Sequence, residues 1–346
     1  MAELSLPRIS VIICTHNPRL DYLQRTLEAL QGQTLPLDQW ELLVIDNASR
    51  EPVGDQYDIS WHPRGRHISE TTLGLTPARL RGVAESQTGL LVFVDDDNIL
   101  DADYLVQALR ISRDYSFLGA WGGQIRPEFE AEPPEWTKPY WGMLAIVELE
   151  RDEWSNCADH RAAAPCGAGM CIRRTVANRY AEVLLAAGKD HERFQLDRRG
   201  THLASCGDSD LALTACDLGM GCGRFTSLRL THLIPSVRLT TSYLVRLTEE
   251  LTYSAHMLRA VRGNLPTEPR RQTLAQRALH QYFRLRIPTH ERDMLDARNR
   301  GEKRAFDYLS RVTLHSSTAQ GNKCGTESAV PRSCSASGPN LSANKR

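Results

Sequence analysis

Three adjacent aspartates, Asp95, Asp96 and Asp97, are the residues of this sequence best suited to chemistry. They follow an uninterrupted apolar run at residues 90–94, LLVFV. A short run of this kind is typical of a strand buried on both faces of a sheet, so the carboxylates are expected where that strand ends. Open α/β sheets bind their ligands at this edge. Oxygen clusters there suit Mg²⁺ or Mn²⁺, in particular when phosphate oxygens complete the coordination.

Two other roles for an acidic stretch of this kind can be weighed from the sequence. A single aspartate caps many helices, and Asp101 or Asp103 can do so for a helix expected over residues 104–111. A calcium-binding loop requires glycine and glutamate at two fixed positions, which Leu100 and Val106 occupy here. Capping therefore remains the alternative to a metal role, and a calcium loop is excluded.

The elements that must position these carboxylates alternate between strand and helix. Largely apolar runs predict three of the strands, the alternation places a fourth near residues 67–69, and apolar residues at helical spacing predict helices between them. This alternation is typical of right-handed βαβ units and a parallel sheet, and hence of an α/β fold. The expected strands are residues 9–14, 41–45, 67–69 and 90–94, and the expected helices are residues 20–30 and 78–86.

Polar residues also follow two of the other expected strands. Thr15, His16 and Asn17 come after the first strand, and Asp46 comes after the second. Because the carboxyl ends of parallel strands meet along one edge, we expect these side chains to share a crevice with the three aspartates. Asp46 can accept a hydrogen bond from the imide N–H of uracil or from a ribose hydroxyl. Its alternative role is to close an Asx turn at the end of the strand.

Composition narrows the class of protein further. The 346 residues are 41% hydrophobic, which is enough for a sizeable core. Lys plus Arg and Asp plus Glu are both 42, so no net charge indicates nucleic acid as a partner. No apolar stretch reaches membrane-spanning length, and no basic and then apolar leader begins the chain. The nine cysteines form no Cys-x-x-Cys pair and are typical of reduced thiols, so we expect a cytoplasmic protein.

Six segments of the chain resemble the family-two glycosyltransferases, inverting enzymes with the A-type nucleotide-sugar fold. The resemblance implies a mostly parallel, Rossmann-like sheet flanked by helices. It also implies a nucleotide-diphosphate sugar as donor (a UDP-sugar is favoured), Mn²⁺ or Mg²⁺ as cofactor, and a sugar or lipid-linked acceptor in cell-surface polysaccharide or glycolipid assembly. The segments occur in the family's order: VIICTHNP (11–18), LLVIDNAS (42–49), GLTPARLRGV (74–83), LVFVDDDN (91–98), GAGMCIRR (167–174) and CGDSDLAL (206–213).

The same resemblance assigns roles to individual residues on the donor side. Asp95 and Asp97 form the Asp-x-Asp pair that holds metal and diphosphate. His232, near the end of a strand expected over residues 227–234, is a third metal ligand or diphosphate contact, or else a structural histidine. Arg238 is a further candidate for the diphosphate. The implied nucleotide and donor contacts are Thr15, Asp46, Arg79, Asp95 and Asp96, and the implied metal ligands are Asp95, Asp97 and His232.

The acceptor side has one candidate catalytic residue. Asp208 and Asp210 stand at the start of a helix expected to reach about residue 218, where the helix dipole favours one aspartate but does not explain two. Inverting transfer needs a general base beside the acceptor hydroxyl. The resemblance places this base at Asp208, and Asp210 is the reserve.

Two positions depart from the family pattern. Leu80 replaces the asparagine of Ala-Arg-Asn on the donor side, and Gly207 replaces the glutamate of Gly-Glu-Asp on the acceptor side. These changes make a nucleotide-sugar-binding protein without turnover an alternative to an enzyme. A nucleotidyltransferase of the same fold is a second alternative, but it would carry a Gly-rich basic loop after the first strand, where THNP (15–18) stands.

The later part of the chain differs in amino-acid composition from the first 118 residues. Residues 119–153 are rich in Gly, Pro and aromatics, so we expect neither a regular helix nor an interior strand there. Their tryptophans suit either sugar stacking or packing under a loop. Small residues at 165–170 allow close approach of a ligand to the backbone. The tryptophans in question are Trp121, Trp136 and Trp141.

The C-terminal region is expected to be an appendage to the catalytic domain. Residues 259–312 carry thirteen Lys and Arg against six Asp and Glu, a net charge of +7, with apolar residues interleaved. This pattern predicts basic amphipathic helices that lie on an anionic membrane or pack on the catalytic domain. The expected domains are a catalytic domain (1–240, with a nucleotide-binding half at 1–118 and a donor-sugar and acceptor half at 119–240), a basic helical appendage (241–312) and a disordered tail (313–346).

Overall fold

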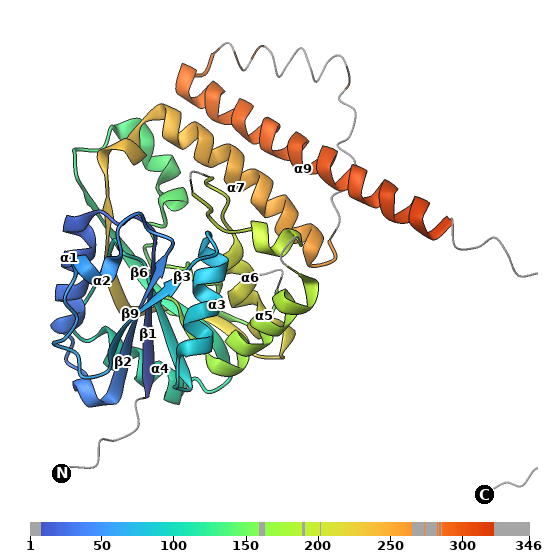
Figure 1. Ribbon diagram of the computed structural model, residues 1–346. Coiled ribbons are helices and arrows are strands. Elements are labelled where there is room, and N and C mark those ends of the chain that lie inside the picture. The colour runs from blue at the N-terminus through green and yellow to red at the C-terminus, as the bar shows by residue number, and fades with distance from the viewer. Residues whose placement is uncertain are drawn as a thin grey trace, which may run out of the picture. The chain divides into compact units, whose positions relative to one another are not determined.

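The computed structural model describes residues 8–158, 163–188, 191–200, 202–264, 273, 282, 284 and 286–321 (Figure 1). The chain divides into two compact units, residues 1–306 and residues 307–346. The first unit is a single mixed β-sheet flanked by helices on both faces. The second unit, where it is described, is the C-terminal part of one helix.

Four parallel strands form one half of the sheet, as the sequence predicted. Their order is β3 (Gly65–Glu70), β2 (Trp40–Asn47), β1 (Ile9–Thr15) and β4 (Leu90–Val94). The polar clusters that follow β1, β2 and β4 therefore lie at one edge of the sheet. The parallel sheet expected for the nucleotide-binding half is confirmed.

The other half of the sheet is mixed rather than parallel. β8 pairs antiparallel with both β4 and β6, whereas β6 and β9 run parallel to each other. β5 and β7 each pair antiparallel with β9. A mostly parallel sheet therefore describes only the half that β1 to β4 form. The additional strands are β5 (Asn98–Leu100), β6 (Leu118–Phe129), β7 (Glu153–Ser155), β8 (Cys171–Arg173) and β9 (Gly221–Ile234).

The expectation that residues 119–153 hold no interior strand is wrong, because β6 lies between β8 and β9. The register between β6 and β9 shifts twice, next to Gly119 and Gly123, so these glycines mark bulges and not the absence of a strand. Pro127 is tolerated for a different reason. Ile125 donates its N–H to the Val147 carbonyl (2.9 Å) on the side away from β9, and Pro127, two residues later, directs its nitrogen to the same side.

Helices cover both faces of the sheet. Alternate residues of β1 show this directly: Ile9, Val11 and Ile13 pack in the layer of α1 and α4, and Ile12 packs in the layer of α3, α5 and α6. A strand covered on both faces is apolar along nearly its whole length, which is why β4 is an unbroken apolar run and the interiors of β1 and β2 are broken only by Ser10 and Glu41 near their starts. The helices are α1 (Leu20–Gln31), α2 (Val53–Gln56), α3 (Leu75–Glu85), α4 (Tyr104–Asp114), α5 (Arg174–Ala187), α6 (Gly207–Asp217), α7 (Thr241–Val261) and α9 (Thr289–Gly321), with 3₁₀ helices η1 (Leu37–Gln39), η2 (Glu135–Leu144), η4 (Glu192–Gln195) and η5 (Ser236–Leu239).

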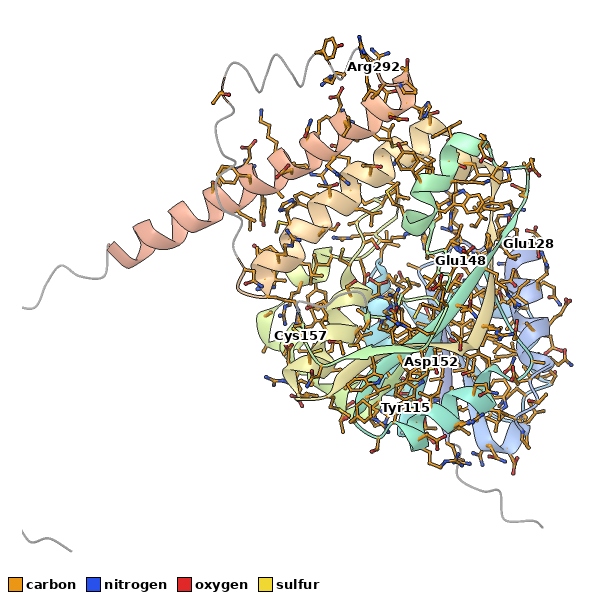
Figure 2. The ribbon with its side chains drawn as sticks, turned by 180° about the vertical axis from the view of Figure 1, so that it is seen from behind. Tyr115, Glu128, Glu148, Asp152, Cys157 and Arg292 are labelled. Carbon is orange, nitrogen blue, oxygen red and sulfur yellow. The ribbon has the colours of Figure 1, made fainter. Side chains whose placement is uncertain are left out.

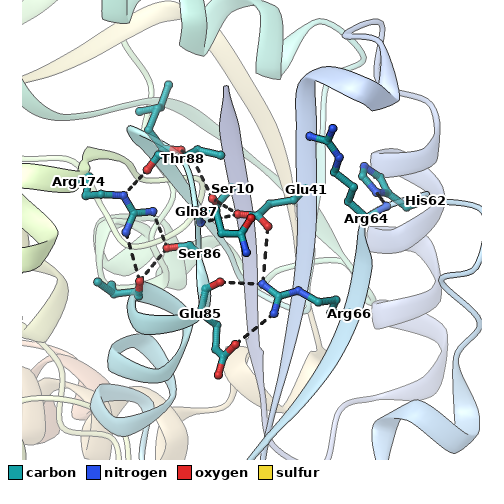
Figure 3. A network of polar contacts seen from close by, with 12 residues as sticks. Ser10, Glu41, His62, Arg64, Arg66, Glu85, Ser86, Gln87, Thr88 and Arg174 are labelled. Carbon is teal, nitrogen blue, oxygen red and sulfur yellow. Dashed lines mark hydrogen bonds and ion pairs between the residues drawn. The ribbon is translucent and has the colours of Figure 1, made fainter. Parts of the chain in front are cut away.

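A buried polar network ties the strands together at the amino-terminal edge of the sheet (Figure 3). The Glu41 side chain, 3% exposed, accepts hydrogen bonds from the Ser10 hydroxyl (2.6 Å) and the Gln87 backbone N–H (2.7 Å). The Ser10 and Thr88 hydroxyls are 2.8 Å apart, and Arg66 lies 3.7 Å from Glu41. Buried polar groups bonded in this way hold β1, β2 and β4 in a single arrangement. This fixes the strands at the edge opposite the expected site.

On the far side of the molecule, the segment after η2 returns along β9 (Figure 2). Asp152 accepts hydrogen bonds from the Thr226 backbone N–H and from its hydroxyl, both at 2.8 Å. Trp154 of β7 is 55% exposed and lies against Phe117, with ring centroids 5.0 Å apart. These contacts lie away from the carboxyl ends of the parallel strands and are structural.

The C-terminal helices follow the predicted helical pattern only in part of the expected range. α7 begins at Thr241, and α9 continues to Gly321, past the expected boundary of the tail at residue 313. Residues 265–272 and 274–281 of the basic appendage and residues 322–346 of the expected tail lie outside the described residues. Among the described helices, none combines the length and the apolar composition that crossing a bilayer requires.

Candidate active site

A cavity of about 600 Å³ opens at the carboxyl ends of β1 and β4. Nearly all of the site residues expected from the sequence line it, although they come from strands, helices and loops far apart in the chain. The exceptions are Asp46 and the reserve base Asp210. The expected residues that line the cavity are Thr15, Arg79, Asp95, Asp96, Asp97, Asp208, His232 and Arg238.

Asp97 is held in place by two basic side chains. His232 Nε2 lies 3.3 Å and Arg238 3.2 Å from the same carboxylate oxygen. Burial alone would raise the pKa of Asp97, but His232 and Arg238 hold it well below its usual range. His232 is fixed in turn by a contact of 3.0 Å between its Nδ1 and the Leu144 carbonyl. Asp97 is therefore a carboxylate at neutral pH.

Asp95 and Asp96 lie in a different electrostatic environment. Burial, together with the charge of Asp97, raises the pKa of Asp95. Burial and Asp97 also raise the pKa of Asp96 to about 7, although a hydrogen bond from the Thr15 hydroxyl opposes the shift. The described residues place no hydrogen-bond donor or ion-pair partner on the Asp95 carboxylate. A cation in the cavity would supply the missing positive charge.

Arg79 projects from α3 into the cavity wall and pairs with a residue that sequence reasoning missed. It lies 3.0 Å from Asp197, and the two side chains are only 6% and 5% exposed. The Thr76 hydroxyl donates a second hydrogen bond to Asp197 at 2.9 Å. Asp197 stands in a loop after η4 without apolar periodicity or a motif around it, so no sequence signal could have identified it.

Asp208 stands at the N-terminus of α6, as expected. One carboxylate oxygen accepts the Gly167 N–H (2.9 Å) and the other accepts the Ser209 N–H (2.7 Å), so the side chain has a fixed orientation at the cavity wall. The glycine before it is required by close approach, because a Cβ at Gly207 would lie 2.3 Å from the carboxylate of Asp197. The Asp197 carboxylate thus occupies the space that a side chain at position 207 would need.

Asp210 cannot serve as the reserve base. Its side chain is fully buried and does not line the cavity. It lies 3.5 Å from Arg193 and 3.6 Å from Arg262, which connects α6 to η4 and to the end of α7. Asp210 is therefore a structural residue, and the two aspartates of this segment have different roles.

Asp46 is engaged in a turn, the alternative that its position at a strand end also allowed. Its two carboxylate oxygens accept the backbone N–H groups of Ser49 (3.1 Å) and Val53 (3.0 Å). It holds the start of α2 and does not line the cavity, whereas its neighbour Asn47 does. A nucleotide contact by Asp46 stays a prediction.

The tryptophans expected to stack on sugar or to pack under a loop do not line the cavity. Trp121 is fully buried in β6, with Arg173 over its ring. Trp136 lies against His290 (ring centroids 4.8 Å apart), and Trp141 lies against Phe129 (5.0 Å). The packing alternative therefore describes all three side chains.

Strained backbone conformations are concentrated around the cavity. Three of the four non-glycine residues with positive φ in the described part of the chain line it: Asn17 (49°), Ala145 (58°) and Cys206 (110°). Such conformations cost about 1–3 kcal/mol each and persist where the surrounding structure enforces them, most often at functional sites. Burial raises the pKa of Cys14 and Cys166 in the cavity wall to about 12, so neither is a thiolate nucleophile.

The residues present fit a divalent cation only in part. In the described part of the chain, no group of three or more His, Cys, Asp or Glu side chains is arranged to hold a metal ion, so Asp95, Asp97 and His232 are not a preformed three-ligand site. Mg²⁺, however, commonly binds one or two carboxylates together with substrate phosphates. Asp95 and Asp97 fit that pattern.

An open α/β sheet with an acidic cavity at the ends of its parallel strands is the arrangement of proteins that bind nucleotides. Comparison of the sequence with family models agrees: residues 10–177 match Glycosyl transferase family 2. This match covers just under half of the chain. The resemblance seen in the sequence is confirmed.

Individual relatives are similar over shorter stretches. The chain is 31% identical over 96 residues to Glycosyltransferase AglE of Haloferax volcanii, covering 27% of this chain and 31% of that protein. It is 25% identical over 114 residues to EpsH of Bacillus subtilis, covering 32% of each chain. The match thus spans about a third of these curated relatives. The solved structure of S. aureus TarS aligns with 86% of this chain and 55% of its own, with 13% identity and a TM-score of 0.46.

Proposed function

We propose that this protein is a metal-dependent, inverting glycosyltransferase that moves a sugar from a nucleotide-diphosphate sugar, a UDP-sugar being favoured, to an acceptor hydroxyl. One observation carries the proposal: the Asp208 carboxylate of α6 lines the same cavity as Asp95 and Asp97, which stand together in the turn between β4 and β5. A carboxylate for the acceptor and a pair for a cation and diphosphate are the groups that inverting transfer requires.

In the proposed reaction, Asp208 takes the proton from the acceptor hydroxyl. The acceptor oxygen attacks the anomeric carbon from the face opposite the diphosphate, and the bond to the diphosphate breaks with its electron pair leaving on oxygen. The hydrogen bonds from Gly167 and Ser209 orient Asp208, and the oxygen that accepts the Gly167 N–H keeps a second lone pair to accept the proton.

The donor end of the cavity supplies charge for the leaving group. A divalent cation, Mn²⁺ or Mg²⁺, would be held by Asp95 and Asp97 and would neutralise the charge that grows on the diphosphate. Arg238, fixed against Asp97, adds a positive charge that belongs to the protein. Thr15 and Arg79 are proposed to contact the nucleotide or its phosphates, and His232 to position Asp97 and Arg238 or to bind the cation.

The proposal is tested by replacing the base without changing its shape. Asp208→Asn should bind UDP in Mn²⁺ as the wild type does, because donor binding depends on other elements, while kcat for transfer falls by about 10²–10⁴. Calorimetry with UDP and an assay of UDP release from a panel of UDP-sugars measure the two quantities. Asp217→Asn, at the exposed other end of α6, is the matched control and should keep full activity.

The outcomes also separate the alternatives. UDP binding without UDP release from any donor, in the presence of Mn²⁺ and simple sugar acceptors, would indicate a binding protein. Full activity of Asp208→Asn would show that the base has been placed wrongly. Unchanged turnover in EDTA would contradict the role of a cation.

A further inference from the structure

One wall of the cavity differs in character from the rest. α7 contributes Tyr243, Leu247 and Leu251, which are spaced by four residues and therefore share one face of the helix. Met143 and Leu144, at the end of η2, line the cavity with them. All the side chains that α7 directs into the cavity are thus aliphatic or aromatic, in contrast to the charged side chains at the ends of β1 and β4.

This apolar wall lies on the acceptor side of the cavity. The Ser254 hydroxyl of α7 accepts the backbone N–H of Ser205 at 3.2 Å, so the helix runs along the segment that leads into Asp208. Ser205 and Cys206 line the cavity between α7 and Asp208. A molecule that places a hydroxyl at Asp208 therefore has the α7 wall beside it.

Packing within the protein does not fully bury the side chains of this wall. Leu247 is 2% exposed and belongs to the core that α7 forms with η2 and η5, but Tyr243, Leu251 and Met143 are only partly buried. When a ligand covers partly exposed apolar side chains in a cavity, the removal of their surface from water favours binding. A purely polar sugar chain offers little apolar surface to such a wall.

We propose that the α7 wall binds an apolar group carried by the acceptor, so that the acceptor is a hydroxyl compound with an alkyl or aromatic portion beside the reacting hydroxyl. The inference rests on the proposed function, because it names the substrate class of the same cavity. Flexible alkyl chains and flat aromatic rings share the chemistry that the wall recognises, and the test below separates them.

The test measures the binding of three probes to the full chain saturated with UDP and Mn²⁺. Calorimetry compares methyl, phenyl and octyl β-D-glucoside, the last below its micelle-forming concentration. The phenyl or octyl glucoside should bind about tenfold or more tightly than the methyl glucoside, which is the usual scale for added apolar groups in a pocket. A stronger gain for octyl indicates an alkyl acceptor, and a stronger gain for phenyl indicates an aromatic one.

Two variants of the same helix show whether the wall is responsible. Leu251→Gln should remove most of the gain, because it makes the cavity face of α7 polar. Val245→Gln is the matched control: Val245 is also a partly buried apolar residue of α7 packed on the same core, but it does not line the cavity. In Val245→Gln, the gain in affinity of the phenyl or octyl glucoside over the methyl glucoside should equal that of the wild type.

Failure of the inference is distinguishable from failure of the proposed function. Normal UDP binding with equal affinities for the three glucosides would overturn the inference alone, and so would an equal loss of the gain in both variants. Absence of UDP binding to the wild type would overturn the proposed function and the inference with it.

Discussion

At the scale of single residues, the pair of Arg79 and Asp197 shows how the cavity wall is held. Both charges are buried, and each depends on the other for compensation. Burial raises the pKa of Asp197, and the Arg79 guanidinium opposes that shift. Removal of one partner from a buried pair leaves an uncompensated charge, which is more costly than the pair itself is stabilising.

Asp197→Asn should therefore lower the free energy of unfolding by about 3 kcal/mol, because Arg79 loses its counter-charge while the shape of the side chain is kept. Urea unfolding followed by circular dichroism measures the change. Glu128→Gln is the control, since Glu128 pairs with Arg25 at the surface, where both side chains are more than 40% exposed, and should cost less than about 1 kcal/mol (Figure 2). Equal effects of the two changes would contradict the compensating role of Asp197.

His62 makes the free energy of unfolding depend on pH, and a variant can separate its contribution from that of the other titrating groups. It is 2% exposed against the Trp40 ring, and burial, with a smaller contribution from Arg64, lowers its pKa from 6.5 to about 4. Above pH 6.5 the imidazole is neutral in both states and its contribution to stability is complete. As the pH falls from 6.5 towards 4, only the unfolded chain takes up the proton, so stability is lost.

His62→Asn should reduce this loss, because asparagine keeps an acceptor for the Arg64 N–H but does not titrate. Between pH 6.5 and 5.0 the wild type should lose about 1–2 kcal/mol more than the variant, given about 1.4 kcal/mol per pH unit for one proton. Urea titrations at both pH values measure the difference. Parallel losses in the two proteins would show that His62 takes up its proton in the folded state at an ordinary pKa.

At the scale of elements, the packing of α9 on α7 is encoded by small and charged residues. Arg300 and Arg304 of α9 form ion pairs of 2.7 Å with Glu249 and Glu250 of α7. Between them, a Cβ at Gly301 would lie 2.4 Å from the Glu249 carbonyl oxygen, so the two backbones approach closely there. Glycine in this helix is a packing residue.

Gly301→Ala should destabilise the protein by about 1–3 kcal/mol through overpacking, although the same change in an exposed helix would stabilise by about 1 kcal/mol. The opposite signs make the experiment decisive. Asn299→Ala, at an exposed position of the same helix, should be neutral or slightly stabilising. Urea unfolding of the two variants provides the comparison, and stabilisation by Gly301→Ala would mean that α9 is not packed on α7 at this point.

At the scale of the whole molecule, the basic C-terminal region has two proposed uses. Four of its arginines already pair with acidic residues: Arg262 with Asp217, Arg284 with Asp296, and Arg300 and Arg304 with α7. The Arg262 pair favours packing on the catalytic domain, and the other three pairs join segments of the C-terminal region to one another. The net charge of +7 over residues 259–312 still leaves an excess for an anionic surface.

If that excess docks the protein on a membrane, binding to phosphatidylcholine vesicles should require added phosphatidylserine and should weaken as salt rises. Exposed charges are screened over about 10 Å at 0.1 M salt, so most of the binding should be lost well before 1 M. Vesicle sedimentation at several salt concentrations measures the effect. Equal sedimentation with neutral and anionic vesicles would leave packing as the role of this region.

The sequence by itself determined the parallel half of the sheet, the edge at which the site lies and four of the five aspartates that line the cavity. Strands covered on both faces are apolar along nearly their whole length, so β1, β2 and β4 are visible as apolar runs, and the polar residues that end them are visible with them. Asp95 and Asp97 could be identified for this reason, whereas Asp208, at a helix start, was identified through the family resemblance.

Only the tertiary structure decided which side chains pair and which serve turns. Arg79 meets Asp197 across 118 positions of sequence, and Asp46 turns back to Ser49 and Val53 instead of lining the cavity. β6 was hidden because its glycines and Pro127 are tolerated by bulges and by an unpaired side of the strand, which are properties of its neighbours. The local sequence pattern indicates which face of an element is buried. Contacts between residues distant in sequence depend on how the elements pack and on the charges that this packing brings together.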